Sequence, residues 1–149
     1  MEWERGQFRI ACGSSLVDLK TVAEFLADSY WAKGIPPTTV ERSIENSLCF
    51  VLLHNNRQIG FARVITDYAT IAYLNDVFVL PNYREQGLGK WLIECVMSHA
   101  KLQGLKRWIL ATRDAHDLYR RYGFTQLKRP EIFMELHDPD VYVSGKGGG

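Results

Sequence analysis

The sequence predicts an α+β fold in which helices flank a mixed, mostly antiparallel central sheet. Three observations lead to this prediction. Segments rich in β-branched and aromatic residues alternate with segments of helical spacing. The tetrapeptide His54-Asn55-Asn56-Arg57 between two apolar runs is typical of a hairpin turn. No internal repeat or linker divides the 149 residues, so we expect one domain over residues 1–139 and a disordered tail over 140–149.

The first half of the chain supplies a strand, two helices and the hairpin. We expect these elements at residues 7–11 (strand), 15–31 and 38–46 (helices), and 48–53 and 58–66 (hairpin strands). Ser14 or Ser15 offers a side-chain oxygen as N-cap of the first helix. Thr38 or Thr39 does the same for the second, after the break at Pro36.

The second half alternates between strands and helices. We expect them at residues 70–80 (strand), 87–103 (helix), 108–111 (buried strand), 113–122 (short helix), and 125–127 and 131–136 (closing strands). Gly104 is placed to end the first of these helices. The whole order is then β-α-α-β-β-β-α-β-α-β-β.

Composition excludes several classes of protein. A formal net charge of +1 gives no reason to expect a nucleic-acid or membrane surface, and no apolar run approaches the ~20 residues of a membrane helix. The N-terminus is charged and lacks the apolar segment of a signal peptide. Three widely spaced cysteines, Cys12, Cys49 and Cys95, indicate reduced thiols in a cytoplasmic protein. The histidines do not cluster with carboxylates or cysteines, so we expect no metal site.

The most informative segment is Arg84-Glu85-Gln86-Gly87-Leu88-Gly89-Lys90, which joins the predicted strand 70–80 to the predicted helix 87–103. A helix start offers free backbone N–H groups and the positive end of the helix dipole, which suit a phosphate or pyrophosphate. The two glycines allow a ligand to approach the backbone, and Arg84 and Lys90 add positive charge. A tight turn made for packing alone is the alternative interpretation.

Two common phosphate loops are excluded. Residue 92 is Leu, where the dinucleotide pattern G-x-G-x-x-G requires glycine. Lys90 is followed by Trp91, where a Walker loop requires Ser or Thr.

The loop instead resembles the acyl-CoA pyrophosphate loop of the GNAT N-acetyltransferase superfamily, Arg/Gln-x-x-Gly-x-Gly/Ala, here Arg84, Gly87 and Gly89. A second segment resembles the family's Ala-x-x-Leu-Tyr-x-x-x-Gly-Phe. Its matching residues are Ala115, Leu118, Tyr119, Gly123 and Phe124. The two motifs occur in the expected order, separated by one helix and one strand. The resemblance implies a GNAT-like fold and acetyl-CoA as cofactor.

The resemblance also implies which residues hold the cofactor. They are Val77, Phe78 and Val79 on the strand, the loop residues Arg84, Glu85, Gln86, Gly87, Leu88, Gly89 and Lys90, and Thr112, which stands where the family often has an Asn. Backbone groups of the strand can meet a ligand only if a neighbouring strand does not occupy them. We therefore expect a β-bulge near Asp76–Phe78, which a continuous ladder through 76–79 would refute.

Acyl transfer to an amine needs an acid for the leaving thiolate and a route for the amine proton. By resemblance Tyr119 is the general acid, and its ordinary pKa near 10 keeps it protonated at neutral pH. A tyrosine packed in the core is the alternative. Many relatives carry a carboxylate nine residues before the loop arginine, where this chain has Asn75. The adjacent Asp76 either holds a water that takes the amine proton or only braces the loop, and both roles remain open.

Tyr30, Trp31, Tyr73 and Asn75 are the candidate acceptor-binding residues. In this superfamily the segment between the first two helices borders the acceptor pocket, so Tyr30 and Trp31 would stack on a planar or cationic acceptor. The alternative is that they close the core where the helices meet.

These observations predict an N-acetyltransferase that moves an acetyl group from acetyl-CoA to a small-molecule or peptide amine by direct transfer in a ternary complex. None of the cysteines has a sequence partner that would activate it, which disfavours an acyl-cysteine. A CoA-binding sensor or partner module with little or no catalysis is the alternative, because the loop serves both. The chain is expected to be a monomer or homodimer, with neither nucleic-acid nor membrane partners.

Overall fold

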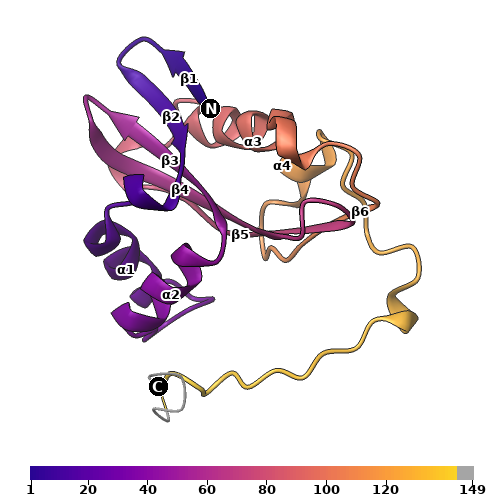
Figure 1. Cartoon of the computed structure of the whole chain (residues 1–149). Coiled ribbons are helices and arrows are strands. Elements are labelled where there is room, and N and C mark those ends of the chain that lie inside the picture. The colour runs from indigo at the N-terminus through magenta and orange to yellow at the C-terminus, as the bar shows by residue number, and fades with distance from the viewer. Residues whose placement is uncertain (144–149) are drawn as a thin grey trace.

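The computed structural model describes residues 1–143, whose strands form one six-stranded sheet with helices on both faces (Figure 1). The strands are β1 (Glu2–Arg5), β2 (Phe8–Cys12), β3 (Leu48–His54), β4 (Arg57–Thr66), β5 (Ile71–Val79) and β6 (Arg107–Leu110), in that order across the sheet. Every neighbouring pair is antiparallel except β5 and β6, which are parallel. The predicted fold class is confirmed, and β1 is a strand that the sequence analysis did not expect.

The helices are α1 (Leu19–Ala27), α2 (Pro37–Glu45), α3 (Leu88–Ser98) and α4 (His116–Arg120). Short 3-10 turns occupy Ser14–Leu16, Pro81–Tyr83, Ala100–Leu102 and Pro130–Ile132. The predicted caps of the first two helices are wrong. Asp18 caps α1 by accepting a hydrogen bond from Thr21 N at 3.3 Å, because the serines are used in the preceding turn. Pro37 begins α2, since its fixed φ suits the first helical position.

The helix predicted for residues 87–103 ends earlier, at Ser98. His99 leaves the helix with extended backbone (φ −61°, ψ 131°), and its buried Nδ1 accepts a hydrogen bond from Lys101 N. Gly104 lies beyond, in a left-handed turn (φ 76°), so it does not end the helix. Burial lowers the pKa of His99, which fits a neutral structural histidine.

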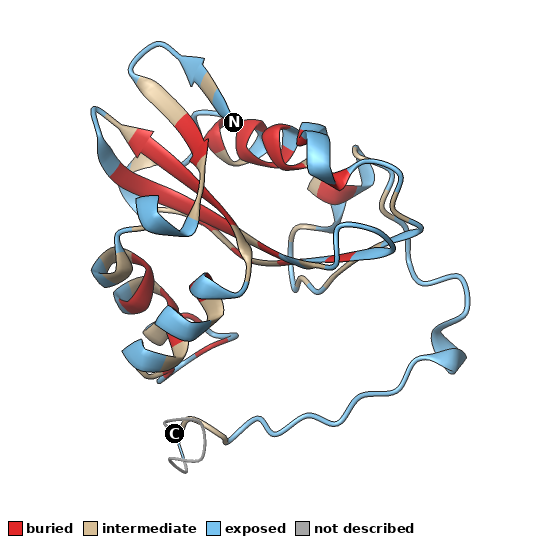
Figure 2. Cartoon of the chain, in the orientation of Figure 1, coloured by how far each residue is buried: buried red, intermediate tan, exposed pale blue. Residues whose placement is uncertain are grey.

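Two apolar cores lie on opposite faces of the sheet. The first is built from the sheet and the buried stripe of α3, including Phe50, Leu52, Ile59, Leu92 and Val96. The second lies beneath α1 and α2 and includes Val22, Leu26, Ile44, Phe61 and Phe78. The sheet is therefore buried on both sides along β3 and β4, as the continuous buried band in Figure 2 shows.

In the middle of strand β5, the alternation of side chains between the two faces of the sheet is shifted by one residue. Ala72 and Leu74 belong to the α3 core, whereas Phe78 belongs to the core beneath α1 and α2. Val77 and Val79, which follow the change, pack against the α3 core. An uninterrupted strand keeps residues of equal parity on one face, so an extra residue must lie between Leu74 and Phe78.

The closing strands predicted at 125–127 and 131–136 are wrong. Residues 125–140 are all exposed, and within the described part of the chain this segment pairs with no strand (Figure 2). Its regular structure is limited to the 3-10 turn at Pro130–Ile132. The segment leaves the body of the molecule and returns at Tyr142, which packs near Gly34 against the core beneath α1 and α2. Of the tail expected at 140–149, residues 144–149 lie outside the described residues.

Candidate active site

A cavity of about 970 Å³ opens where β5 and β6 separate. The parallel ladder joins Ile71–Leu74 to Arg107–Leu110, and β5 then continues alone to Val79. The free edge of β5 and the connection between α1 and α2 form the walls together with α4. Twelve predicted site residues line this one cavity: Tyr30, Trp31, Tyr73, Asn75, Asp76, Val77, Phe78, Val79, Arg84, Gly89, Thr112 and Tyr119.

The predicted bulge is present and lies at the cavity wall. In the β4–β5 ladder, Phe61 pairs with Phe78 and Arg63 pairs with Asn75, so Asp76 and Val77 together oppose Ala62. Asp76 has left-handed backbone (φ 52°), and its N–H is bonded to the Asn75 side chain at 2.9 Å. The bulge therefore interrupts the ladder beside the cavity, and it is also the extra residue that exchanges the two faces of β5.

The Asp76 carboxylate is held by two donors from distant parts of the chain. Trp31 Nε1 donates to Oδ1 at 2.8 Å, and Arg63 Nε donates to Oδ2 at 2.8 Å. Arg63 also donates from Nη1 to the Ser47 hydroxyl at 3.1 Å. The Asp76 and Arg63 side chains are only 7% and 11% exposed, so this is a buried ion pair. Its geometry ties the bulge to β4 and to the α1–α2 connection.

The aromatic pair of the α1–α2 connection is anchored on its inner side and open on its outer side. Trp31 contacts Phe25 and Tyr30, with ring centroids 6.2 and 5.1 Å away. The Arg113 guanidinium lies 3.8 Å from the centroid of the Tyr30 ring. Tyr30 remains 53% and Trp31 39% exposed, so both rings combine a packing contact with a surface that faces the cavity.

Tyr119 lies on α4 and is 7% exposed at the cavity wall. Its ring packs on Phe124, and its hydroxyl makes no hydrogen bond within the described residues. Because these residues contain no fully buried side-chain oxygen without a partner, the hydroxyl is not sealed off from the cavity. Burial, with a smaller contribution from Tyr30, raises the pKa of Tyr119 to about 12. The hydroxyl therefore keeps its proton well above neutral pH. A tyrosine that served only the core would normally bond its hydroxyl to a protein acceptor.

The loop before α3 has the features expected of an anion site. Glu85 and Gly87 adopt left-handed backbone (φ 65° and 78°), and Gly87 is the N-cap of α3 without a side-chain cap. The first N–H groups of the helix thus lack intrahelical acceptors. A Cβ atom built on Gly87 would meet nothing within 4 Å, so the space above the loop is open. Arg84 Nε donates to the Val79 carbonyl at 3.0 Å and fastens the loop to β5.

The remaining predicted cofactor residues adjoin the cavity without lining it. They are Glu85, Gln86, Gly87, Leu88 and Lys90, on the loop and the first turn of α3. Thr112 does line it, and its Oγ1 accepts a hydrogen bond from Ala115 N at 3.1 Å, which leaves the hydroxyl proton for a ligand. The open loop and the interrupted edge of β5 fit the two ends of a CoA thioester, and the roles of individual residues stay predictions.

Sequence reasoning missed two positive side chains of the site, Arg63 and Arg113. Arg63 is the buried partner of Asp76, and Arg113 covers Tyr30. A signal for Arg63 was available, because it is the lone charge inside the apolar strand segment 59–65. A buried charge needs a partner, and the nearest acidic residue across the hairpin is Asp76. Arg113 lies in an irregular connection, where no periodicity indicates which way a side chain points.

The three cysteine thiols are unsuited to act as nucleophiles. Burial raises the pKa of Cys12 to about 11 and those of Cys49 and Cys95 to about 12, and all three are free. Within residues 1–143, no group of three or more His, Cys, Asp or Glu side chains is arranged to hold a metal ion. The same residues include no helix with the length and apolar character to cross a membrane.

Comparison with known proteins identifies the family. The model of the acetyltransferase (GNAT) domain matches residues 45–126, more than half of the chain. This chain therefore belongs to the GNAT acetyltransferases, which confirms the predicted resemblance and an acetyltransferase enzyme. GNAT acetyltransferases use acetyl-CoA as their acetyl donor. The alternative of a CoA-binding module without catalysis is not favoured.

Individual relatives agree with this assignment. A GNAT-family protein from Xanthomonas campestris has a solved structure with a TM-score of 0.85 and 49% identity, covering 89% of this chain and 96% of that one. A candidate acetyltransferase of Gibberella zeae is 27% identical over 140 residues, 78% of each chain. The [ribosomal protein bS18]-alanine N-acetyltransferase of Haemophilus influenzae is 32% identical over 88 residues, 56% of this chain and 58% of the relative. A Clostridium acetobutylicum structure containing acetyl-CoA shares the fold, with a TM-score of 0.63 and 16% identity over 92% of this chain and 96% of that one.

Proposed function

We propose that this chain acetylates an amine directly, with acetyl-CoA and the acceptor bound together in the cavity between β5, β6 and the α1–α2 connection. The observation that carries this proposal is the meeting of two features in one cavity. One is the interrupted edge of β5 at the bulge, and the other is Tyr119, whose hydroxyl makes no hydrogen bond within the described residues and is not sealed off from the cavity. Acetyl-CoA supplies an acetyl group activated as a thioester.

The residues on the cofactor side of the cavity bind and orient acetyl-CoA. The N–H groups at the start of α3 and the charges of Arg84 and Lys90 attract the pyrophosphate. Because the bulge interrupts the ladder, backbone groups of Val77–Val79 are placed to hold the pantetheine arm and the acetyl carbonyl. Arg84 links the two parts through its bond to the Val79 carbonyl.

Tyr119 holds the proton that the leaving sulfur requires. The pKa of about 12 keeps Oη protonated at neutral pH, and since the hydroxyl makes no hydrogen bond within the described residues, its proton is available to a ligand in the cavity. The contacts of Asp76 support a bracing role over that of a water-holding base, since both of its oxygens already accept hydrogen bonds. The acceptor amine then loses its proton to solvent.

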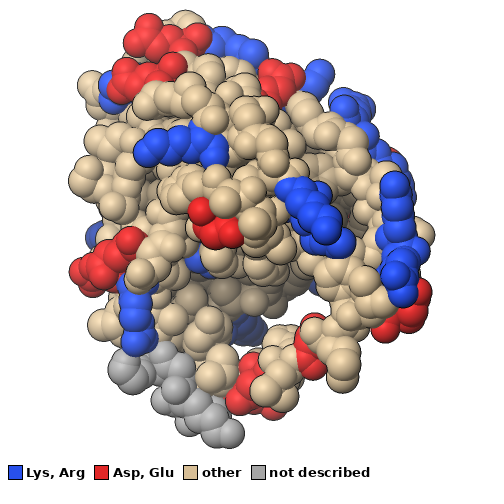
Figure 3. Space-filling model, turned by 45° about the vertical axis from the view of Figure 1, so that its right-hand side comes forward, with Lys and Arg blue, Asp and Glu red and all other residues tan. Residues whose placement is uncertain are grey.

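The properties of the three cysteine thiols support direct transfer of the acetyl group, without an acyl-cysteine intermediate. A nucleophilic cysteine needs a lowered pKa and access to the site, whereas these thiols have raised pKa values and none lines the cavity. The exposed faces of Tyr30 and Trp31 are the proposed acceptor surface. On the face shown in Figure 3, basic and acidic side chains are interspersed and the surface is hollowed beside the C-terminal segment. We propose a small-molecule or peptide amine as acceptor, and the Haemophilus relative gives peptide N-termini priority.

The test measures thiol release from acetyl-CoA across small amines, aminoglycosides and peptides with free N-terminal or lysine amines. For the accepted amine, Tyr119→Phe should lower kcat roughly 10²–10⁴-fold with little change in the affinity for acetyl-CoA. Tyr68→Phe is the matched control, because Tyr68 is 47% exposed and lies outside the cavity lining. Unchanged turnover in Tyr119→Phe would remove this residue from the mechanism. A covalent acetyl-enzyme trapped without acceptor would contradict direct transfer.

A further inference from the structure

The charged side chains of the active-site cavity fall into two groups. Among the described residues, the charged members of the lining are Asp76, Arg84, Arg113 and Asp114. Arg84 is bonded to the end of β5 on the cofactor side, and Asp76 is closed in its buried ion pair. The side chains of Arg113 and Asp114 form no ion pair and no hydrogen bond within residues 1–143. These two charges are therefore available to a ligand.

The contact with Tyr30 holds Arg113 in place and leaves its hydrogen-bond donors unused. Arg113 Cζ lies 3.8 Å from the centroid of the Tyr30 ring. At this distance the guanidinium lies flat on the ring, because an edge-on approach would hold the carbon atom farther away. Stacking uses one face of the guanidinium, whereas its N–H groups point outward in its plane. Such a planar fork of donors matches the two oxygens of a carboxylate.

The stacked pair lies close to the proposed general acid. Arg113 belongs to the connection between β6 and α4, and Tyr30 belongs to the α1–α2 connection, so their contact joins two walls of the cavity. Tyr30 also contributes to the raised pKa of Tyr119, which places the two phenol groups near each other. A group bound by Arg113 is therefore held near the amine that attacks the acetyl carbonyl.

The same contact disfavours an acceptor that carries positive charge alone. An aromatic face attracts cations, but one face of Tyr30 already carries the Arg113 cation. Asp114 offers the opposite charge in the same cavity, and amines reach an enzyme at neutral pH largely as ammonium ions. The two unpaired charges thus match an acceptor that carries both an amine and an acidic group.

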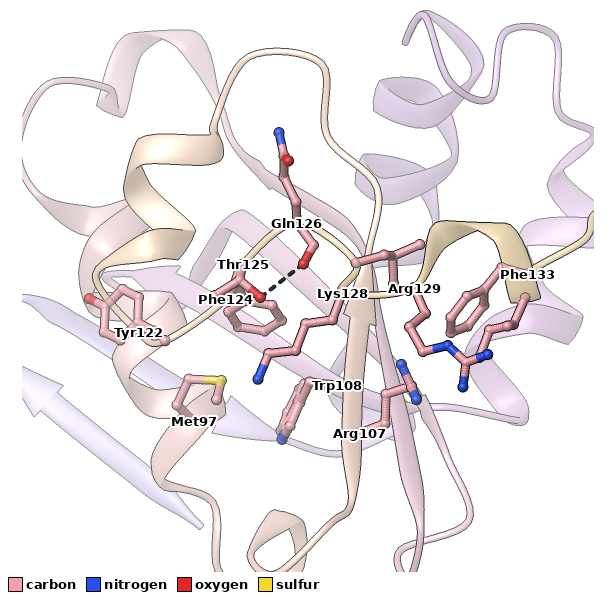
Figure 4. A pocket seen from close by; sticks show the side chains of 13 residues that line it. Met97, Arg107, Trp108, Tyr122, Phe124, Thr125, Gln126, Lys128, Arg129 and Phe133 are labelled. Carbon is pink, nitrogen blue, oxygen red and sulfur yellow. Dashed lines mark hydrogen bonds between the residues drawn. The ribbon is translucent and has the colours of Figure 1, made fainter.

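A second cavity, of about 490 Å³, contains an arginine in a similar contact but no proposed reacting group. This cavity lies beside β6, and none of its lining residues lines the active-site cavity. Arg107 and Phe133 belong to its wall (Figure 4), and Arg107 Cζ lies 4.9 Å from the centroid of the Phe133 ring. Arg107 therefore provides a control for Arg113 with the same side chain and the same type of contact in another cavity.

We propose that Arg113 is a specificity-determining residue that binds a carboxylate of the acceptor, so that the preferred acceptor is an amine with a carboxylate a few bonds from the reacting nitrogen. This inference rests on the proposed function, the acetylation of an amine in this cavity. Two sources supply the same chemistry: a free amino acid, and a peptide whose N-terminal amine is followed by an acidic side chain.

The test measures thiol release from acetyl-CoA with pairs of acceptors that differ only in the acidic group. Amino acids are compared with their amides, and peptides with Asp or Glu in second position are compared with the same peptides carrying Asn or Gln. A hydrogen bond to a charged group should give the acidic member an advantage of roughly 10–10²-fold in kcat/KM. The kind of pair that shows the advantage distinguishes the two sources.

Substitutions of Arg113 assign this advantage to one side chain. Arg113→Gln should raise KM for the acidic member of each pair and leave both the neutral member and the affinity for acetyl-CoA unchanged. Arg113→Lys keeps the charge without the planar fork and should retain part of the advantage. Arg107→Gln is the matched control and should behave as the native chain, because Arg107 lines the other cavity.

The possible failures can be told apart. Equal turnover of both members of every pair, or an advantage that Arg113→Gln leaves unchanged, would overturn the role of Arg113 while the proposed function stands. A variant that loses only affinity for acetyl-CoA would assign Arg113 to the cofactor and also contradict the inference. Absence of thiol release with every amine would overturn the proposed function, and this inference with it.

Discussion

The antiparallel region from β1 to β5 and the region from β6 to Val143 are built in different ways. In the first, successive ladders cover long strands, and two cores bury both faces of the sheet. In the second, a four-residue strand and the five-residue α4 precede sixteen consecutive exposed residues, 125–140. The site takes its geometry from the first region, through Asp76, Arg63 and Trp31, and its acid from the second, through Tyr119. Rigid positioning is thus combined with a reactive group that is supported by fewer contacts.

The largest effect on the first region is expected from Arg63→Met. This change leaves the buried Asp76 carboxylate with Trp31 as its charge-stabilising donor and should cost about 3–5 kcal/mol of unfolding free energy. Denaturant unfolding measures it. Adding Asp76→Asn, which removes the orphaned charge and tolerates the left-handed backbone, should recover most of the loss. If the double variant is no more stable than Arg63→Met, the ion pair does not hold the bulge.

A smaller loss is expected from Trp31→Phe, which keeps an aromatic ring on Phe25 but removes the donor to Asp76 Oδ1. A hydrogen bond to a charged group contributes roughly 1.5–3 kcal/mol, so the melting temperature should fall accordingly. Tyr30→Phe is the control, because it keeps the ring beneath Arg113 and removes only a hydroxyl. Equal stability of both variants would mean that the indole N–H does not support the bulge.

Gly60→Ala tests the packing of the ladders. An added Cβ would lie 2.9 Å from the carbonyl oxygen of Phe78, a backbone atom next to the bulge, and 2.8 Å from Leu52 Cδ2. We expect a loss of roughly 1–3 kcal/mol in thermal or denaturant unfolding. Gly89→Ala is the matched control, since its new Cβ would meet only Val79 Cγ2 at 3.9 Å in a helix that favours alanine. Comparable destabilisation by both changes would contradict the tight approach at Gly60.

The effect that is absent near neutral pH and appears only in alkali is a gradual loss of stability. Cys49 and Cys95 have folded pKa values of about 12 against an ordinary value of 9.0, so folding favours the protonated thiols. Their contribution is complete below pH about 9 and disappears as the pH rises towards 12. Unfolding measured from pH 8 to 11 should show a decline that is shallower in Cys49→Ala with Cys95→Ala. An equal slope would assign the decline to other groups, Tyr119 among them.

Local patterns in the sequence predicted most of the first region and of the site. Alternation, the asparagine turn and the glycine loop indicated the hairpin, β5 and α3, and the bulge followed from the need for free backbone groups. The buried network could not be predicted, because Trp31, Arg63 and Asp76 meet only after three distant segments pack. The closing strands were wrong because alternation at 131–136 indicates that a segment can form a strand, not that a partner strand lies within the same chain.

The bulge at Asp76 also limits how this strand can be redesigned. Removing one residue between Asn75 and Val77 would restore a regular ladder, and the later side chains would keep their faces, because Phe78 would still pair with Phe61. Phe78 would stay towards α1 and α2, and Val77 and Val79 would stay towards α3. The deletion would keep the contents of both cores and close the interruption that borders the cavity. The bulge therefore serves the cavity edge and not the distribution of apolar residues between the two cores.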